Sequence, residues 1–153
     1  MRVKKVLVIT VVAVAIFISV LASRSFTSSP GDQMIDTGLL HAMVVENAYR
    51  MEAGRKMKFM IIDARSPEEY KEAHVFGAVS IPEKDFEKSL RLLPGDKNTL
   101  MVVYCNDRKC ERSRRWAVKA FAAGYSNVVV YSDGFPYWKD KHMPVTALRA
   151  LTE

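Results

Sequence analysis

A chain of 153 residues is long enough for one domain with an appendage, and its 49% hydrophobic and 26% charged residues are typical of a globular protein. The net charge of +6 is compatible with nucleic acid, anionic lipid or a small anionic ligand as a partner. No long basic run or aromatic-interleaved basic patch favours nucleic acid. Two cysteines are too few for a disulfide scaffold or a four-cysteine zinc site. We therefore expect no metal, no cofactor and no nucleic-acid partner.

The N-terminus combines a basic stretch, residues 1–5, with an uninterrupted apolar run over residues 6–22, VLVITVVAVAIFISVLA. A run of about 17 residues is at the short limit for a membrane-spanning helix and at the long limit for a signal-peptide core. The basic flank is expected to stay in the cytoplasm. The sequence thus predicts either a single-pass anchor in the cell membrane or a cleaved signal peptide. Both place the remaining chain on the extracytoplasmic, periplasmic side.

The rest of the chain divides into a linker, a domain and a short tail. Residues 23–41 begin with a stretch rich in serine, glycine and proline, which is typical of a linker. The domain is predicted over residues 42–148, with residues 149–153 as a C-terminal tail, and we expect it to be monomeric. It is long enough to bury one core.

Apolar runs and helix signals alternate through the domain. In chain order we expect strands over 42–45, 58–63, 77–82, 100–105 and 127–131, and helices over 46–53, 67–73, 83–93, 111–123 and 135–141. Pro67 suits the first turn of a helix, and Gly124 suits the end of one. The continuous apolar run over 100–105 is typical of a strand covered on both faces. The alternation predicts an α/β fold, a five-stranded parallel sheet with helices on both faces.

The segment VVYCNDRKCERS, residues 102–113, carries the strongest chemical signal. Cys105 falls at the carboxyl end of the most apolar strand, the edge of a parallel sheet where ligands bind. A loop that leads into a helix N-terminus directs backbone amides toward one point. These amides, with Arg108, Lys109 and Arg112 nearby, can lower a cysteine pKa from about 8.5 to about 3.5–7.5. The sequence therefore predicts a reactive thiolate, with Asp107 and Glu111 facing solvent.

Four segments in order resemble the rhodanese family. They are Asp63, Arg65, Glu69 and Tyr70 in an Asp-x-Arg turn with a following Glu-Tyr, the segment Ala73 to Ala78, the strand-terminal Cys105, and the segment Asp133 to Trp138. The resemblance covers residues from about 44 to 146. It implies a sulfurtransferase, in which the cysteine takes a sulfane sulfur from a donor such as thiosulfate and passes it to cyanide or a thiol.

The resemblance also implies roles for individual residues. Cys105 is the expected catalytic residue, and the substrate-binding residues are expected to be Asn106, Asp107, Arg108, Lys109 and Cys110. Asp63, Arg65 and Arg112 are expected to support the loop. The implied partners are a small anionic sulfur donor and a thiol acceptor, which is either a small molecule or a protein.

The sequence departs from the family pattern at three positions. Cys110 stands where many members have arginine, and Ala73 and Asp133 each replace the first glycine of a glycine motif. A Cys-x4-Cys spacing leaves two interpretations of Cys110. It is either a resolving thiol that forms a disulfide with Cys105, or a half-buried loop residue without a role.

Two other functions stay open at this stage. A membrane-tethered module that binds a partner or senses redox state is compatible with the same sequence. A cysteine phosphatase would need an arginine six residues after its cysteine, but Glu111 occupies that position and Arg112 follows it.

Overall fold

The computed structural model describes residues 31–147. The apolar segment predicted over residues 6–22, its basic flank and the tail over 149–153 lie outside the described residues. Between residues 31 and 147, no helix has both the length and the apolar character needed to cross a bilayer.

Five parallel strands form the central sheet, in the order β1-β6-β5-β2-β4. In chain order the strands are β1 (Met34–Ile35), β2 (Met60–Asp63), β4 (Ala78–Ser80), β5 (Met101–Tyr104) and β6 (Val128–Tyr131). All four residues of β5 are buried, as the continuous apolar run predicted. The parallel five-stranded sheet is therefore confirmed.

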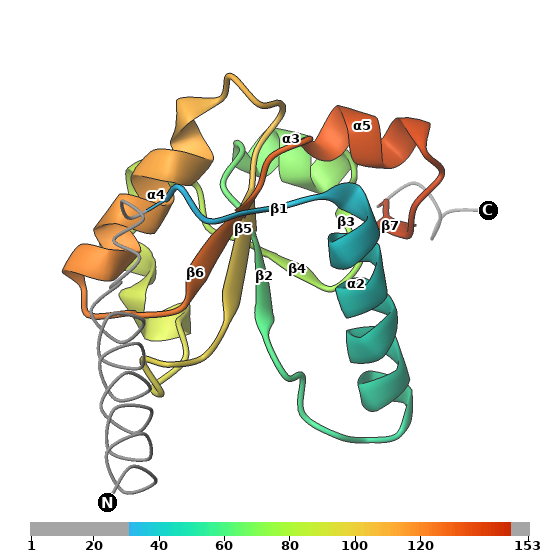
Figure 1. The fold of residues 1–153 in the computed structure, drawn as a ribbon, viewed down its shortest axis with the longest axis horizontal. Coiled ribbons are helices and arrows are strands. Elements are labelled where there is room, and N and C mark those ends of the chain that lie inside the picture. Colours follow the sequence, from blue (N-terminus) through green and yellow to red (C-terminus); the bar gives the residue numbers. More distant parts are fainter. Residues whose placement is uncertain (1–30, 148–153) are drawn as a thin grey trace, which may run out of the picture.

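Helices cover both faces of this sheet (Figure 1). One face carries α4 (Glu111–Ala122) and two short 3-10 helices, η1 (Glu83–Asp85) and η2 (Glu87–Leu92). The other face carries α2 (Thr37–Glu52) and α5 (Phe135–Asp140), with α3 (Pro67–Glu72) near its edge. The layering agrees with the predicted α/β fold.

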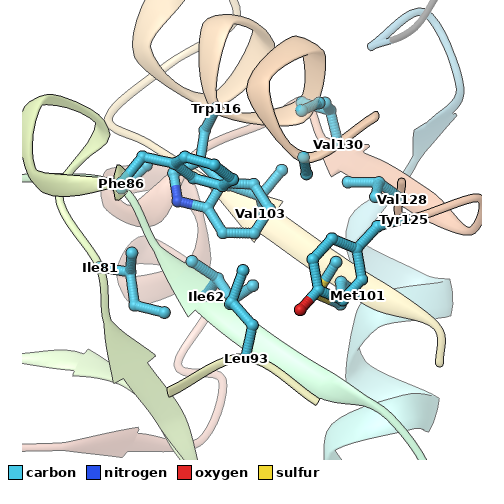
Figure 2. Packing of buried hydrophobic residues seen from close by; sticks show 13 residues of the cluster. Ile62, Ile81, Phe86, Leu93, Met101, Val103, Trp116, Tyr125, Val128 and Val130 are labelled. Carbon is cyan, nitrogen blue, oxygen red and sulfur yellow. The ribbon is translucent and has the colours of Figure 1, made fainter. Parts of the chain in front are cut away.

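The core beneath α4 packs around Trp116, which is fully buried (Figure 2). Its indole ring contacts Phe86 edge to face, with the ring centroids 5.1 Å apart. Val103 of β5 and Ile62 of β2 face this cluster from the sheet. Alternate residues of β5 therefore point to opposite layers, since Tyr104 belongs to the core on the other face.

The strand predicted over 42–45 is wrong, because these residues lie inside α2. The helix begins after Asp36, whose carboxylate accepts a hydrogen bond from Leu39 N at 2.8 Å. Leu40, Val44 and Asn47 are its buried residues, at helical spacing. The short apolar run was thus one part of an amphipathic helix that starts five residues earlier.

The first strand of the sheet is instead β1, which pairs in parallel with β6. It has only two residues, too few to produce a periodic signal. Residues 34–41, which the sequence analysis assigned to a linker, consequently include β1 and the first turn of α2.

Two further details differ from the expected elements. The helix predicted over 83–93 is split into η1 and η2, which meet at Phe86. A small antiparallel pair also joins β3 (His74–Val75) to β7 (Val145–Thr146). This pair fastens the C-terminal part of the described chain against the turn after α3.

Adjacent leucines in α2 test whether this helix belongs to the folded unit. Leu40 is fully buried, whereas Leu39 is 52% exposed. We expect Leu40→Ala to lower the free energy of unfolding by about 2–5 kcal/mol, because it removes packing and leaves a cavity. Leu39→Ala is the matched control and should change it by less than about 0.5 kcal/mol. Equal effects in chemical denaturation would contradict the placement of α2.

Candidate active site

Cys105 directly follows β5, and α4 begins six residues later at Glu111. Only 1% of Cys105 is exposed, and Cys110 is half-buried at the N-cap of α4. The two cysteines form a disulfide, with their Cα atoms 6.2 Å apart. Residues 105–110 therefore form a closed loop at the carboxyl edge of the sheet, and we call them the cysteine loop.

Glu69 holds one side of the cysteine loop. Its carboxylate accepts hydrogen bonds from Asn106 Nδ2 at 2.7 Å and from Arg112 Nη1 at 3.2 Å. It also completes a capping box with Ser66 at the start of α3. Burial alone would raise the pKa of Glu69, but these hydrogen bonds and the charge of Arg112 lower it to about 2. Glu69 is thus a fixed anion that joins α3 to the loop.

Asp133 holds the opposite side. Arg108 donates two hydrogen bonds to its Oδ1, at 2.6 Å from Nη2 and 3.1 Å from Nε. Thr37 donates to Oδ2 from its hydroxyl at 2.8 Å and from its amide at 3.3 Å. Burial opposes ionisation of Asp133, but Arg108 and Thr37 outweigh it and lower the pKa of the carboxyl group. The start of α2 is thereby linked to the loop through a single carboxylate.

Gly134 lets the backbone after β6 approach the loop closely. Its φ of +84° belongs to the region that favours glycine. A Cβ there would lie 2.7 Å from Asp107 N and closer still to the carbonyl group of Asn106. The amide of the next residue, Phe135, donates to Cys105 O at 2.9 Å. Only glycine fits this contact, so the segment after β6 fixes the path of the loop.

A buried charged network lies beneath the loop. Asp63 and Arg65 are both buried and form an ion pair, with Nη2 and Oδ2 2.6 Å apart. The hydroxyl group of Tyr104 donates to the same carboxylate oxygen at 2.6 Å and accepts from Val75 N. Burial and the charge of Asp63 raise the pKa of Tyr104, which keeps the hydroxyl protonated as a donor.

The guanidinium of Arg65 is also fixed in place. It donates to Ala73 O at 2.7 Å and lies 3.9 Å from the ring centroid of Phe135. Burial would lower the pKa of Arg65, but its hydrogen bonds and ion pair with Asp63 raise it. Asp63 and Arg65 thus form internal contacts below the loop.

The cations in the loop and in the first turn of α4 are arranged differently from the expectation. Arg108 and Arg112 are paired with Asp133 and Glu69, so their charges are partly compensated by carboxylates. Lys109 is exposed and has no ion pair within residues 31–147. Asp107 and Glu111 are exposed, as predicted. Lys109 is therefore the cation of the loop that is best placed to meet a solute anion.

The backbone amides of the loop fall into two groups. Lys109 N donates to Asp107 Oδ1 at 2.7 Å, and Cys110 N donates to Asp107 O at 3.1 Å. The amides of residues 106–108 donate to no acceptor in the described part of the chain. A hollow of about 530 Å³ lies beside the loop, lined by Asp107, Arg108, Lys109, Asp133 and Tyr137. The loop thus borders a cavity with charged walls.

Some residues of the site had no signal in the sequence alone. Asp133 entered only as a departure from a glycine motif, and Thr37 was assigned to a linker. Glu69 was noted for its motif, but its bonds to Asn106 and Arg112 join segments at least 37 residues apart. His74 has a structural role in the folded chain: it stacks on Tyr70, and its Nδ1 lies 2.8 Å from Tyr70 O.

Comparison with known proteins agrees with this arrangement. A sequence model described as the Rhodanese-like domain matches residues 45–141. The chain belongs to the rhodanese-like family. The predicted resemblance is therefore confirmed.

One curated relative matches part of the chain. Thiosulfate sulfurtransferase PspE of Escherichia coli K12 is 44% identical over 45 residues, which are 29% of this chain and 43% of PspE. The chain therefore matches less than half the length of that relative.

Solved structures share the fold at low sequence identity. The Rhodanese-like domain of the Alr3790 protein from Anabaena has a TM-score of 0.59 at 22% identity, over 82% of this chain and 85% of that one. Thiosulfate sulfurtransferase from Pseudomonas aeruginosa has a TM-score of 0.58 at 21% identity, over 75% of this chain and 20% of that one. These likenesses show a shared fold.

The close approach at Gly134 can be separated from ordinary backbone strain. Gly54 also has a positive φ, +67°, but a Cβ there would meet no atom within 4 Å. We expect Gly54→Ala to cost about 1–2 kcal/mol through strain alone. Gly134→Ala should cost more and should also speed amide hydrogen exchange in residues 105–110, because the loop must move. Equal losses of stability with unchanged loop exchange would contradict the contact.

Proposed function

We propose that this rhodanese-like protein is a sulfurtransferase that moves a sulfane sulfur from a small anionic donor such as thiosulfate to a thiol or cyanide. The observation that carries the proposal is the place of Cys105, at the end of β5 and in a loop that leads into the N-terminus of α4. The family includes sulfurtransferases, and the matched relative from E. coli is named as a thiosulfate sulfurtransferase.

The proposed reaction has two displacement steps. The reduced Cys105 thiolate attacks the outer sulfur of thiosulfate, the sulfur–sulfur bond breaks, and sulfite leaves with the electron pair. The product is a persulfide on Cys105. Cyanide or a thiolate then attacks the outer sulfur, and the Cys105 thiolate leaves and is restored.

Donor binding in this proposal relies on groups of the cysteine loop that are not already satisfied. The charge of Lys109 and the amides of residues 106–108 favour an anion in the hollow beside the loop. Arg108 and Arg112 contribute chiefly by fixing the shape of the loop, since they are bound to Asp133 and Glu69. The reaction starts from the reduced protein, because Cys105 in the disulfide has no thiolate to offer.

A redox module without turnover is the second candidate, and the Cys105–Cys110 disulfide is the observation that favours it. In that case the two cysteines would alternate between dithiol and disulfide without accepting sulfur. A cysteine phosphatase has less support. Glu111 occupies the position of the phosphate-binding arginine, and Arg112 is bound to Glu69.

The deciding test is sulfur transfer by the reduced full-length protein. We expect wild type to gain one sulfur atom on Cys105 after addition of thiosulfate, and to lose it as thiocyanate when cyanide is added. Cys105→Ser should abolish both, because the serine hydroxyl group is not ionised at neutral pH. Mass spectrometry of the protein and a thiocyanate assay provide the measurements.

Two results would redirect the assignment. A protein that forms the disulfide but never takes up sulfur would be a redox module. Phosphate release from a model ester without any sulfur uptake would support the phosphatase.

We further propose that the domain lies outside the cytoplasm, tethered or exported through residues 6–22. The basic flank and apolar run of the sequence support this location. We expect protease added to intact spheroplasts to digest the domain, and the size of the protein in the membrane fraction to show whether the segment is cleaved. Full protection from protease, with digestion only after lysis, would refute the proposed location.

A further inference from the structure

Cys110 is bonded to Cys105 through the disulfide. Cys110 is the N-cap residue of α4, a position where a side chain normally accepts a hydrogen bond from the helix amides. Cys110 makes no such bond, and its sulfur atom is bonded to Cys105 instead. The side chain that begins the helix thus contacts the sulfur of the proposed nucleophile.

Contacts other than the disulfide keep the two cysteines close. Asn106 is bound to Glu69, and Arg108 is bound to Asp133, on opposite sides of the loop. Within the loop, Cys110 N donates to Asp107 O, and Lys109 N donates to Asp107 Oδ1. The Cα separation of 6.2 Å lies inside the usual range for a disulfide, about 4.4–6.8 Å. We therefore expect the two thiols to remain neighbours when the bond is reduced.

The position of Cys110 also favours its ionised form. The first amides of α4 have no partners inside the helix, and they carry the positive end of its dipole. A thiol at a helix N-terminus has a lowered pKa, so a larger share of it is thiolate at neutral pH. The first turn of α4 also carries the exposed Glu111, whose negative charge acts in the opposite direction.

We propose that Cys110 is an internal acceptor that releases the sulfur of the Cys105 persulfide as hydrosulfide. This inference rests on the proposed sulfur uptake at Cys105 and adds a second activity, the reductive release of sulfide from the donor. The Cys105–Cys110 disulfide is then the product state of one turnover.

The proposed step balances without an external oxidant. The Cys110 thiolate attacks Cys105 Sγ, and the bond between Sγ and the outer sulfur breaks. The outer sulfur leaves with the electron pair and takes up a proton as hydrosulfide. The two cysteine thiols are oxidised to the disulfide, and the sulfane sulfur is reduced.

A second turnover requires a two-electron reductant. We assign this role to an external dithiol, such as the active pair of a thioredoxin-like protein, which returns Cys105 and Cys110 to thiols. The overall reaction converts thiosulfate and a dithiol into sulfite, hydrosulfide and a disulfide.

A single turnover without any added thiol or cyanide tests the step, because an external thiol would itself release sulfide from a persulfide. The reduced, desalted full-length protein receives thiosulfate whose outer sulfur carries a heavy isotope. In wild type we expect the Cys105 persulfide to convert to the disulfide, with about one equivalent of labelled hydrosulfide per protein. The wild-type time course is informative on its own, whatever the folding of any variant.

Two matched variants assign the roles. Cys110→Ser should load labelled sulfur on Cys105, keep it as a persulfide and release no hydrosulfide. Cys105→Ser should take up no sulfur.

The failure of this inference is distinct from the failure of the proposed function. A wild-type persulfide that persists as long as that of Cys110→Ser would overturn the inference and leave sulfur transfer intact. Label found as a persulfide on Cys110, without a disulfide, would also overturn it. Absence of sulfur uptake and thiocyanate formation in both wild type and Cys110→Ser would remove the proposed function itself.

Discussion

Two half-buried carboxylates, Glu69 and Asp133, hold the loop that contains Cys105 from both sides. Ordering a backbone costs about 1–2 kcal/mol per residue in lost conformational entropy, so a loop of six residues needs strong local contacts. Charge-assisted hydrogen bonds to Asn106, Arg108 and Arg112 supply them from both sides. The spacing of the two cysteines, and with it the chemistry proposed for them, depends on these anchors.

Beneath Glu69 and Asp133, the buried ion pair of Asp63 and Arg65 positions neighbouring side chains. Replacing a buried ion pair by apolar side chains is often neutral for stability, so the pair is poor evidence for a stability role. Its geometry is more informative. The carboxylate orients the hydroxyl group of Tyr104, and the guanidinium group lies against Phe135. The pair thus joins β5, the turn after β2 and the start of α5 below Cys105.

Much of the fold was predictable because its central strands are buried on both faces. A continuous apolar run such as residues 100–105 predicts a buried strand even when the strands that pair with it are unknown. The same rule misassigned residues 42–45, because an apolar segment of four residues is too short to distinguish a strand from a turn of helix, and only Val44 of the four is buried. The two-residue β1 had no periodicity to read, since it is defined by pairing with β6 almost a hundred residues later.

The candidate site was predictable to a similar extent. Cys105 is identified by its place at a strand end, and the local pair Asp63 and Arg65 by the resemblance to the rhodanese family. The partners of Arg108 and Asn106 come from segments 25 and 37 residues away, so only the folded chain shows them.

The outermost strands of the sheet, β1 and β4, have only two and three residues. An edge strand offers unpaired amide and carbonyl groups on which another chain can add as a further strand. Edge strands as short as β1 and β4 expose few such groups. Their shortness protects the sheet against edge-to-edge aggregation when many copies of the protein are crowded together.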